Sequence, residues 1–293
     1  MSAPGSPRFE ADWLALREGA DADARDAGLL VPLRAHLAAE HGRRRGGSLN
    51  IHDLGSGTGS MARWLAPLLD GPQHWVLHDR DPELLERAAG FPPEPAADGA
   101  PVTVRTRLAD LTELDAVDLK GADLVTASAL LDLLTADELN GLAEACTGVG
   151  CPVLLTLSVA GHVVLTPDHP LDADIAAAFN AHQRREVQGR RLLGPDAPDA
   201  AARAFRRRGA PVYRRSSPWR LGPEQRRLMR QWLEGWVAAA VEQRTELSTE
   251  ARTYVEWRLG ECASGRLRAE VHHVDLLVLP DGPAAEGRHE ERS

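Results

Sequence analysis

A glycine-rich turn directly after an apolar run constrains this chain more than any other feature. Three glycines at alternate positions, Gly55, Gly57 and Gly59, follow the apolar segment 49–54, and a helical pattern begins near Met61. Glycine lets the backbone turn tightly and approach a ligand closely, where a side chain would collide with it. The helix start supplies unpaired N–H groups nearby. The stretch therefore predicts a strand, a binding turn and a helix.

The glycine spacing and an acidic residue before it distinguish between two kinds of ligand. A dinucleotide-binding turn reads G-x-G-x-x-G, whereas residues 55–59 read G-x-G-x-G with Asp53 two positions before the first glycine. A carboxylate there favours a ligand that carries an ammonium group. The pattern resembles motif I of the class I S-adenosylmethionine-dependent methyltransferases. This resemblance implies that Asp53 and the glycine turn hold the amino acid part of S-adenosylmethionine.

Acidic residues also end the next two predicted strands. Residues 74–78 read as a second strand that Asp79 ends, and residues 102–108 as a third strand followed by Asp110. A carboxylate at the position of Asp79 can accept hydrogen bonds from both ribose hydroxyl groups. The resemblance implies that Asp110 lies near the adenine amino group, although a solvated turn cap is an alternative for it. It assigns these residues to the cofactor: Asp53, Gly55, Ser56, Gly57, Gly59, Asp79, Arg80, Asp110, Leu111 and Ser128.

Strand and helix patterns alternate as far as residue 160. Residues 122–127 read as a fourth strand, and residues 152–159 as a fifth. The helix between them opens with the capping pair Thr135 and Glu138. Such units predict a parallel sheet with ligands at the carboxyl ends of its strands. With the resemblance, they predict an α/β fold with a seven-stranded, mostly parallel, doubly wound sheet of the Rossmann-like methyltransferase type.

The rest of the chain predicts additions to this core. We expect a loop over 160–170, a helix over 172–188, and two late strands over 211–221 and 270–279 with a helical insertion between them. The predicted parts are an N-terminal helical segment (1–47), an S-adenosylmethionine-binding core (48–160), a C-terminal half of the sheet with a helical substrate cap (161–280) and a disordered tail (281–293).

Charge and composition narrow the classes of partner. The net charge of −9 disfavours a general nucleic-acid binder. However, 14 arginines lie between Arg184 and Arg230. They form either solvated helix faces or a positive rim that attracts an anionic small molecule or an RNA. A missing signal pattern and the absence of an 18-residue apolar run predict a cytoplasmic protein without a membrane span. The three cysteines match no zinc spacing, so no metal is expected.

Candidate catalytic and substrate-binding residues lie after the fourth and fifth strands. His182 is the candidate base, because polar residues cluster around it on a predicted helix; a surface or capping histidine is the alternative. Ser128 and Asp132 follow the fourth strand, where family members often contact substrate or cofactor. The late tryptophans either pack the core or line a pocket, and they are Trp219, Trp232, Trp236 and Trp257.

The sequence thus predicts a methyltransferase that acts on an oxygen or nitrogen of a small molecule, an anionic or specialised metabolite being the leading class. The alternatives are an RNA methyltransferase, aminocarboxypropyl transfer from the same cofactor, and an inactive cofactor-binding module. No N/D-P-P-Y/F string follows the fourth strand, which disfavours adenine or glutamine N-methylation. The glycine spacing disfavours a nicotinamide dehydrogenase. The sequence does not indicate an oligomeric state.

Overall fold

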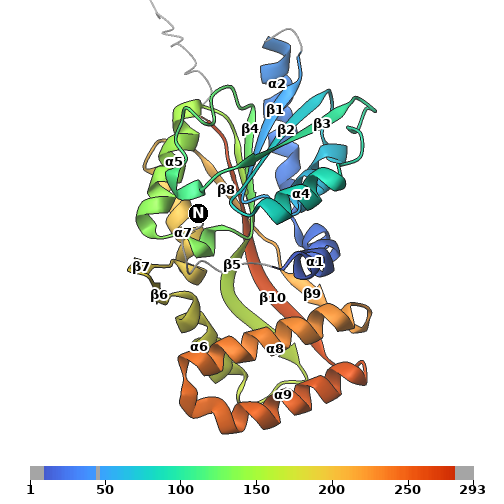
Figure 1. Ribbon diagram of the computed structural model, residues 1–293, viewed down its shortest axis with the longest axis vertical. Helices are drawn as coiled ribbons and strands as arrows, with labels where there is room; N and C mark the ends of the chain where they lie inside the picture. Colours follow the sequence, from blue (N-terminus) through green and yellow to red (C-terminus); the bar gives the residue numbers. More distant parts are fainter. Residues whose placement is uncertain (1–9, 44–46, 281–293) are drawn as a thin grey trace, which may run out of the picture.

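The computed structural model describes residues 10–43 and 47–280, and its centre is a mixed, mostly parallel sheet (Figure 1). Seven strands lie in the order β3-β2-β1-β4-β5-β10-β8, and the short β9 pairs with β10 beside β8. The first five of these in the order pair in parallel, whereas β10 runs antiparallel to β5, β8 and β9. The strands are β1 (Leu49–Leu54), β2 (Gln73–Asp79), β3 (Val102–Leu108), β4 (Leu124–Ser128), β5 (Val153–Thr166), β8 (Val212–Ser216), β9 (Trp219–Leu221) and β10 (Arg268–Val278).

Helices cover both faces of this sheet, which confirms the doubly wound α/β prediction. They are α1 (Ala11–Ala24), α2 (Leu30–Arg43), α3 (Ser60–Leu65), α4 (Pro82–Gly90), α5 (Ala136–Val149), α6 (Asp172–Gln183), α7 (Ala197–Arg206), α8 (Arg226–Gln243) and α9 (Ser248–Ala263). Short 3₁₀ turns are η1 (Ala27–Leu29), η2 (Ala66–Leu68), η3 (Leu111–Glu113), η4 (Leu131–Leu133), η5 (Gly194–Asp196), η6 (Pro223–Gln225) and η7 (Thr245–Leu247). A separate hairpin pairs β6 (Glu186–Val187) with β7 (Arg190–Arg191).

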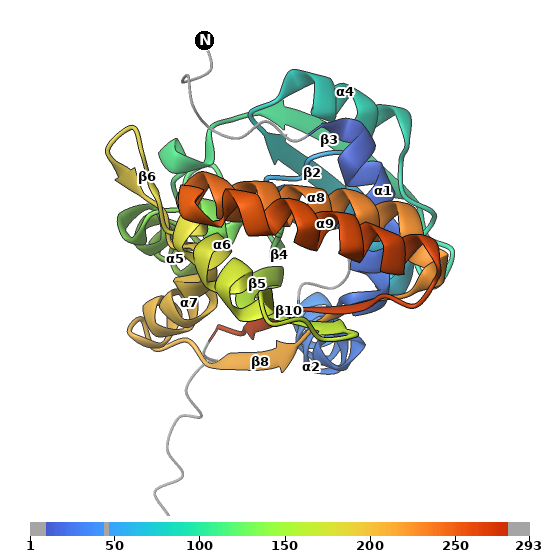
Figure 2. The same cartoon turned by 90° about the horizontal axis from the view of Figure 1, so that it is seen from below.

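Three apolar cores hold these layers together. One packs α5 and α7 against one face of the sheet, and a second packs α2, α3 and α4 against the other. The third joins α6, α8 and α9 to β9 and to the outer halves of β5 and β10. Figures 1 and 2 show α8 and α9 lying side by side across the end of the molecule where those two long strands emerge. The last core therefore forms a cap beyond the carboxyl ends of the parallel strands.

Local signals placed several elements correctly. The third strand has its predicted bounds, and the helix after β4 opens with the predicted capping box of Thr135 and Glu138. Asp81 caps α4 with an acceptor at 3.0 Å from the backbone N–H of Glu83. The helical insertion between the last strands is present as α8 and α9. In these segments the pattern of apolar side chains and the capping residues indicate the same element boundaries.

Other predictions were wrong where distant strands decide the outcome. The segment 160–170 was expected to be a loop, but β5 continues to Thr166 because the first half of β10 pairs with it. The predicted strand 211–221 is broken into β8 and β9 at Ser217 and Pro218, because proline lacks the N–H that a continuous ladder needs. The helix expected over 172–188 ends at Gln183.

Two absences hold for the part of the chain that the structure describes. None of its helices combines the length and apolar character that a membrane span requires. None of its His, Cys, Asp and Glu side chains gather in threes around a possible metal position. The predicted tail, residues 281–293, lies outside the described residues.

A single buried carboxylate ties together three segments at the centre of the molecule. Asp275 on β10 is 1% exposed and accepts the backbone N–H of Asp26 at 2.8 Å, that of Leu157 at 2.7 Å and the hydroxyl of Ser217 at 2.5 Å. Leu157 has a left-handed backbone (φ 54°), a strained conformation for a branched side chain. The bond from its N–H to Asp275 stabilises this bulge in β5.

We expect Asp275→Ala to lower the free energy of unfolding by about 3 kcal/mol or more, since three buried donors lose their acceptor at about 1–3 kcal/mol each. Denaturant titration measures this change. Asp98→Ala is the control, because Asp98 is exposed and caps only a surface turn. An equal, small effect of both substitutions would contradict the role given to Asp275.

Candidate functional site

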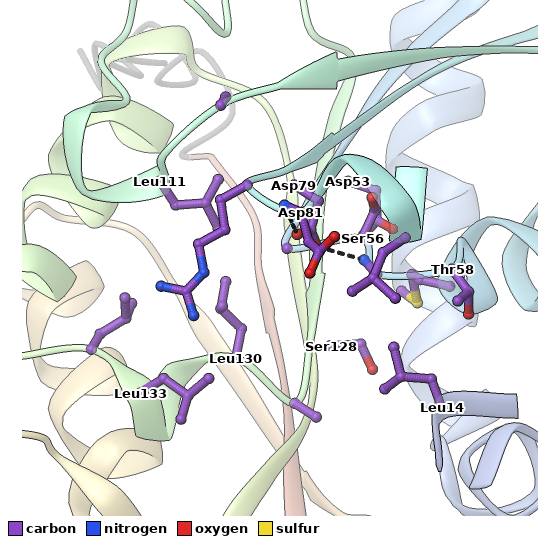
Figure 3. A pocket seen from close by; sticks show the side chains of 18 of the residues that line it. Leu14, Asp53, Ser56, Thr58, Asp79, Asp81, Leu111, Ser128, Leu130 and Leu133 are labelled. Atoms are coloured by element: carbon purple, nitrogen blue, oxygen red, sulfur yellow. Dashed lines mark hydrogen bonds between the residues drawn. The ribbon is translucent and has the colours of Figure 1, made fainter. Parts of the chain in front are cut away.

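A cavity of about 400 Å³ lies at the carboxyl ends of β1, β2, β3 and β4 (Figure 3). One wall carries the loops that follow these strands. The opposite side is closed by α1, by η4 and by the β6–β7 hairpin. The volume falls within the range of about 300–1,000 Å³ for small-molecule sites. The cavity is therefore large enough for a cofactor-sized ligand.

The glycine turn has the conformation that its sequence requires. Gly55, Gly57 and Gly59 have φ values of 64°, 53° and 82°, a region that other residues rarely adopt. A Cβ on Gly57 would lie 3.1 Å from the Leu14 side chain, which packs against the turn. Gly55 and Gly57 line the cavity, as do Ser56 and Thr58. Gly59 does not; it lies at the N-terminus of α3, where its Cα packs close to Ala88.

Asp53, the penultimate residue of β1, lies beneath this turn, and only one of its two carboxylate oxygens has a hydrogen-bond partner within the part of the chain that the structure describes. Its Oδ1 accepts the Thr126 hydroxyl at 2.7 Å, whereas Oδ2 is buried and has no partner among the described residues. Burial raises the pKa of Asp53 to about 7, against the Thr126 hydrogen bond and the charge of Arg25. A buried acceptor without a donor is costly unless a ligand or a water supplies one.

Asp79 ends β2 and organises the turn itself. Its Oδ2 accepts the Gly57 N–H at 2.8 Å, and its Oδ1 accepts the Asp81 N–H at 2.9 Å. Burial raises its pKa, which these backbone donors partly offset. The carboxylate lines the cavity beside Asp53 and Ser56 (Figure 3). The two acidic residues expected at adjacent strand ends thus share one wall.

The remaining predicted cofactor residues also line the cavity. Asp110 is exposed and accepts the N–H and hydroxyl of Thr112, at 3.0 and 2.8 Å, so it is a turn cap as well as a wall residue. Arg80 and Leu111 flank it. Ser128 ends β4 and lines the cavity, whereas Asp132 does not line it.

The N-terminal segment contributes wall residues that the sequence did not reveal. Leu14, Arg17 and Asp21 of α1 line the cavity, at spacings of three and four that share one helix face. Behind them Arg25 is 4% exposed and donates to the hydroxyls of Ser128 at 3.1 Å and Ser60 at 3.4 Å. Helical spacing predicts that face of α1, but only the tertiary fold shows that it meets the cavity.

Two groups of predicted candidates lie elsewhere. His182 does not line the cavity; its Nε2 lies 3.3 Å from Glu242 and its Nδ1 3.1 Å from Arg185. Burial lowers its pKa. The tryptophans pack the cap: Trp232 and Trp236 stack at 5.4 Å, and Trp219 donates its indole N–H to Asp21. None of these residues lines this cavity. Trp219 and Trp236 are buried in the core of the cap, and Trp232 and Trp236 also line a separate small cavity there.

Comparison with known proteins agrees with this geometry. Residues 51–150, which hold the glycine turn and all three strand-end carboxylates, match the family model of the methyltransferase domain. Residues 51–150 therefore form a methyltransferase domain, in agreement with the resemblance of the glycine turn to the class I S-adenosylmethionine-dependent methyltransferases. The protein is an enzyme of the transferase class, and no curated protein matches its sequence.

Solved structures with a similar course of the chain are distant. A methyltransferase from Geobacter sulfurreducens in complex with S-adenosylhomocysteine is 17% identical, with 92% of this chain and 98% of that chain covered and a TM-score of 0.40. One from Thiobacillus denitrificans is 15% identical (94% and 100% covered, TM-score 0.42). A cyclopropane-fatty-acyl-phospholipid synthase-like protein from Lactobacillus casei is 17% identical (90% and 98% covered, TM-score 0.48). Similarity at this level carries no information about the acceptor.

Proposed function

We propose that this methyltransferase binds S-adenosylmethionine along the ends of β1, β2 and β3 and methylates an oxygen or nitrogen of a small molecule. When bound, the cofactor supplies a methyl group on a sulfonium sulfur, which needs alignment more than activation. The observation that carries the proposal is the wall itself: a glycine turn flanked by Asp53, Asp79 and Asp110 at three consecutive strand ends.

Asp53 is suited to the amino group of the cofactor. Its buried Oδ2 has no donor among the described residues, and an ammonium group would supply one directly or through a water. The Ser56 hydroxyl in the turn is likewise buried without a described partner. Both atoms are satisfied by a ligand with several polar groups at this end of the cavity.

Asp79 is suited to the ribose. A carboxylate offers about four acceptor positions, and two of them take the N–H groups of Gly57 and Asp81. The Arg80 backbone N–H also donates to this carboxylate, so about one position remains for a ribose hydroxyl. Asp110, Leu111 and Arg80 then surround the position that adenine would take. Gly59 supports the turn from behind through the start of α3.

Arg25 supplies a counter-charge for the carboxylate of the cofactor. Its Nε and one terminal nitrogen are buried with no described partner, and its other nitrogen donates to Ser60 and Ser128. The Ser128 hydroxyl also accepts from Thr156 at 3.0 Å, so its own hydrogen is free to point into the cavity. A cation behind two cavity hydroxyls, next to Asp53, matches the two charges of an amino acid.

Proton transfer in this cavity has few candidates. Among the described residues that line it there is no His, Lys, Cys or Tyr, so only aspartates could accept a proton there. His182 lies outside it. An acceptor that is nucleophilic without a strong base on the protein therefore suits this site best.

The surface charges favour a small molecule over RNA. Several arginines of the positive segment are held by acidic residues, in the pairs Arg184–Asp196, Arg190–Glu138, Arg208–Glu144 and Arg214–Asp199. Such pairing reduces the field available to a phosphate backbone. We also propose that residues 48–160 hold the cofactor while residues 161–280 cap the acceptor, together with α1.

The function is tested by Asp79→Ala. We expect its affinity for S-adenosylhomocysteine to fall by about 10- to 150-fold, from the loss of hydrogen bonds to a charged group worth about 1.5–3 kcal/mol. Titration calorimetry on folded protein measures this, with Asp70→Ala as a control because Asp70 is exposed and outside the cavity. Unchanged affinity in a folded Asp79→Ala protein would overturn the ribose assignment.

The role of Arg25 is tested by comparing two ligands. We expect Arg25→Met to lower affinity for S-adenosylhomocysteine at least tenfold, through the lost counter-charge. Affinity for 5′-methylthioadenosine, which lacks the amino acid carboxylate, should change less than twofold. Calorimetric titration of both ligands gives the comparison. Equal losses for the two ligands would show that Arg25 only supports the fold.

The pKa of Asp53 predicts the pH dependence of binding. An ammonium ligand favours the ionised carboxylate, so binding should release a proton near pH 7 and affinity should fall as the pH drops through about 7. Titrations between pH 6 and 8, in buffers of different ionisation enthalpy, measure both effects. Asp53→Asn should remove the proton release; its persistence in that variant would assign it to another group.

A further inference from the structure

The side of the cavity opposite the strand-end carboxylates has a different chemistry. It is built by α1, by η4 and by the β6–β7 hairpin with the residue after it. Both α1 and the hairpin lie outside the residues that match the family model, whereas Leu130, Leu133 and Leu134 lie within them. We call this side of the cavity the acceptor wall. Its members are Leu14, Arg17, Asp21, Leu130, Leu133, Leu134, Val187, Arg190 and Leu192.

Six of the nine side chains of the acceptor wall are aliphatic. Leu130 borders the glycine turn at Gly55 and Leu14 borders it at Gly57, whereas Leu133 lies farther from the turn (Figure 3). An aliphatic surface favours apolar contact and supplies no hydrogen bond to a polar ligand atom. A charged group placed against these side chains would lose hydration without compensation.

The first arginine of the acceptor wall is already neutralised. Arg17 donates to both carboxylate oxygens of Asp21, from Nε at 2.9 Å and from a terminal nitrogen at 3.1 Å. Its guanidinium also lies over the Trp219 ring at 4.9 Å. Asp21 in turn accepts the Trp219 indole N–H at 2.9 Å. These contacts hold the guanidinium of Arg17 in place, and the Arg17–Asp21 pair carries no net charge.

The second arginine is neutralised in the same way. Arg190 donates to both carboxylate oxygens of Glu138, at 2.8 and 2.7 Å, and to the Leu133 carbonyl at 3.2 Å. Three of its donors are therefore used by the protein. The pair joins the hairpin to the start of α5, so release of Arg190 toward a ligand would break this link.

We propose that the acceptor wall selects an uncharged acceptor with an apolar body, rather than an anionic one. The inference rests on the proposed function, since it assumes that the cofactor occupies the opposite wall. Aliphatic contacts supply the binding energy, and the two internally paired arginines exclude charge selection because their partners would have to be displaced. This replaces the expectation of an acidic metabolite, which the count of arginines in the sequence had favoured.

A matched pair of probes tests the proposal. The full chain is first saturated with S-adenosylhomocysteine and then titrated calorimetrically with 2-naphthol or with 2-naphthoate, which share a ring system and differ in charge. We expect 2-naphthol to bind at least tenfold more tightly. Equal or tighter binding of 2-naphthoate, or binding of neither probe, would overturn the proposal. Failure of S-adenosylhomocysteine to bind would instead count against the proposed function.

One variant locates the probe. Leu133→Asp places a charge on the acceptor wall at a half-buried position, and we expect it to weaken 2-naphthol binding at least tenfold while S-adenosylhomocysteine affinity changes less than twofold. Val117→Asp is the control, since Val117 is 77% exposed and does not line the cavity. Unchanged 2-naphthol binding in Leu133→Asp would place the probe elsewhere and contradict the proposal.

A second variant tests the neutralisation directly. Glu138→Gln keeps a residue that can complete the capping box of α5 but removes the charge that holds Arg190. We expect it to tighten 2-naphthoate binding at least fivefold and to leave 2-naphthol binding within twofold. No gain in 2-naphthoate affinity would show that the ion pair does not set the charge preference.

Discussion

The buried carboxylate of Asp275 is the contact on which the arrangement of the cavity depends. It accepts hydrogen bonds from the junction that follows α1, from the strained bulge of β5 at Leu157 and from the break between β8 and β9 at Ser217. These three segments connect the parallel sheet to the cap. Because α1 carries one side of the cavity and the sheet carries the other, the same carboxylate holds the two walls in register. An aspartate can do this because its two carboxylate oxygens accept several donors at once.

The sequence predicts well which residues come together around the glycine turn, although their role toward a cofactor stays a proposal. Asp79 ends a strand, Gly55, Gly57 and Asp110 follow one by a few residues, and the carboxyl ends of parallel strands meet at one edge of the sheet. Local order along the chain therefore becomes proximity in space without any knowledge of long-range packing. The same reasoning located the cap at Thr135, because a cap depends only on the residues within one turn.

The acceptor wall could not be predicted, because it depends on contacts between distant segments. Leu14 and Arg17 meet the glycine turn only through the packing of α1, and Arg190 reaches Glu138 across 52 residues of sequence. The polar cluster around His182 was a misleading signal for the cavity, since its partners are Glu242 and Arg185 in the cap. The number of arginines likewise did not predict which ligand charge the acceptor wall favours. Arg17 and Arg190 are paired with Asp21 and Glu138, and these pairs determine the charge that a ligand contacts.

Titration of the purified chain with S-adenosylmethionine, S-adenosylhomocysteine and NAD tests the central claim most directly. The glycine turn and the carboxylates Asp53 and Asp79 predict saturable binding of both sulfur ligands at one site, at micromolar concentrations of the order usual for cofactors, and no binding of NAD. Binding of NAD, with none of either sulfur ligand, would mean that the turn accepts a pyrophosphate and would contradict the account of the site.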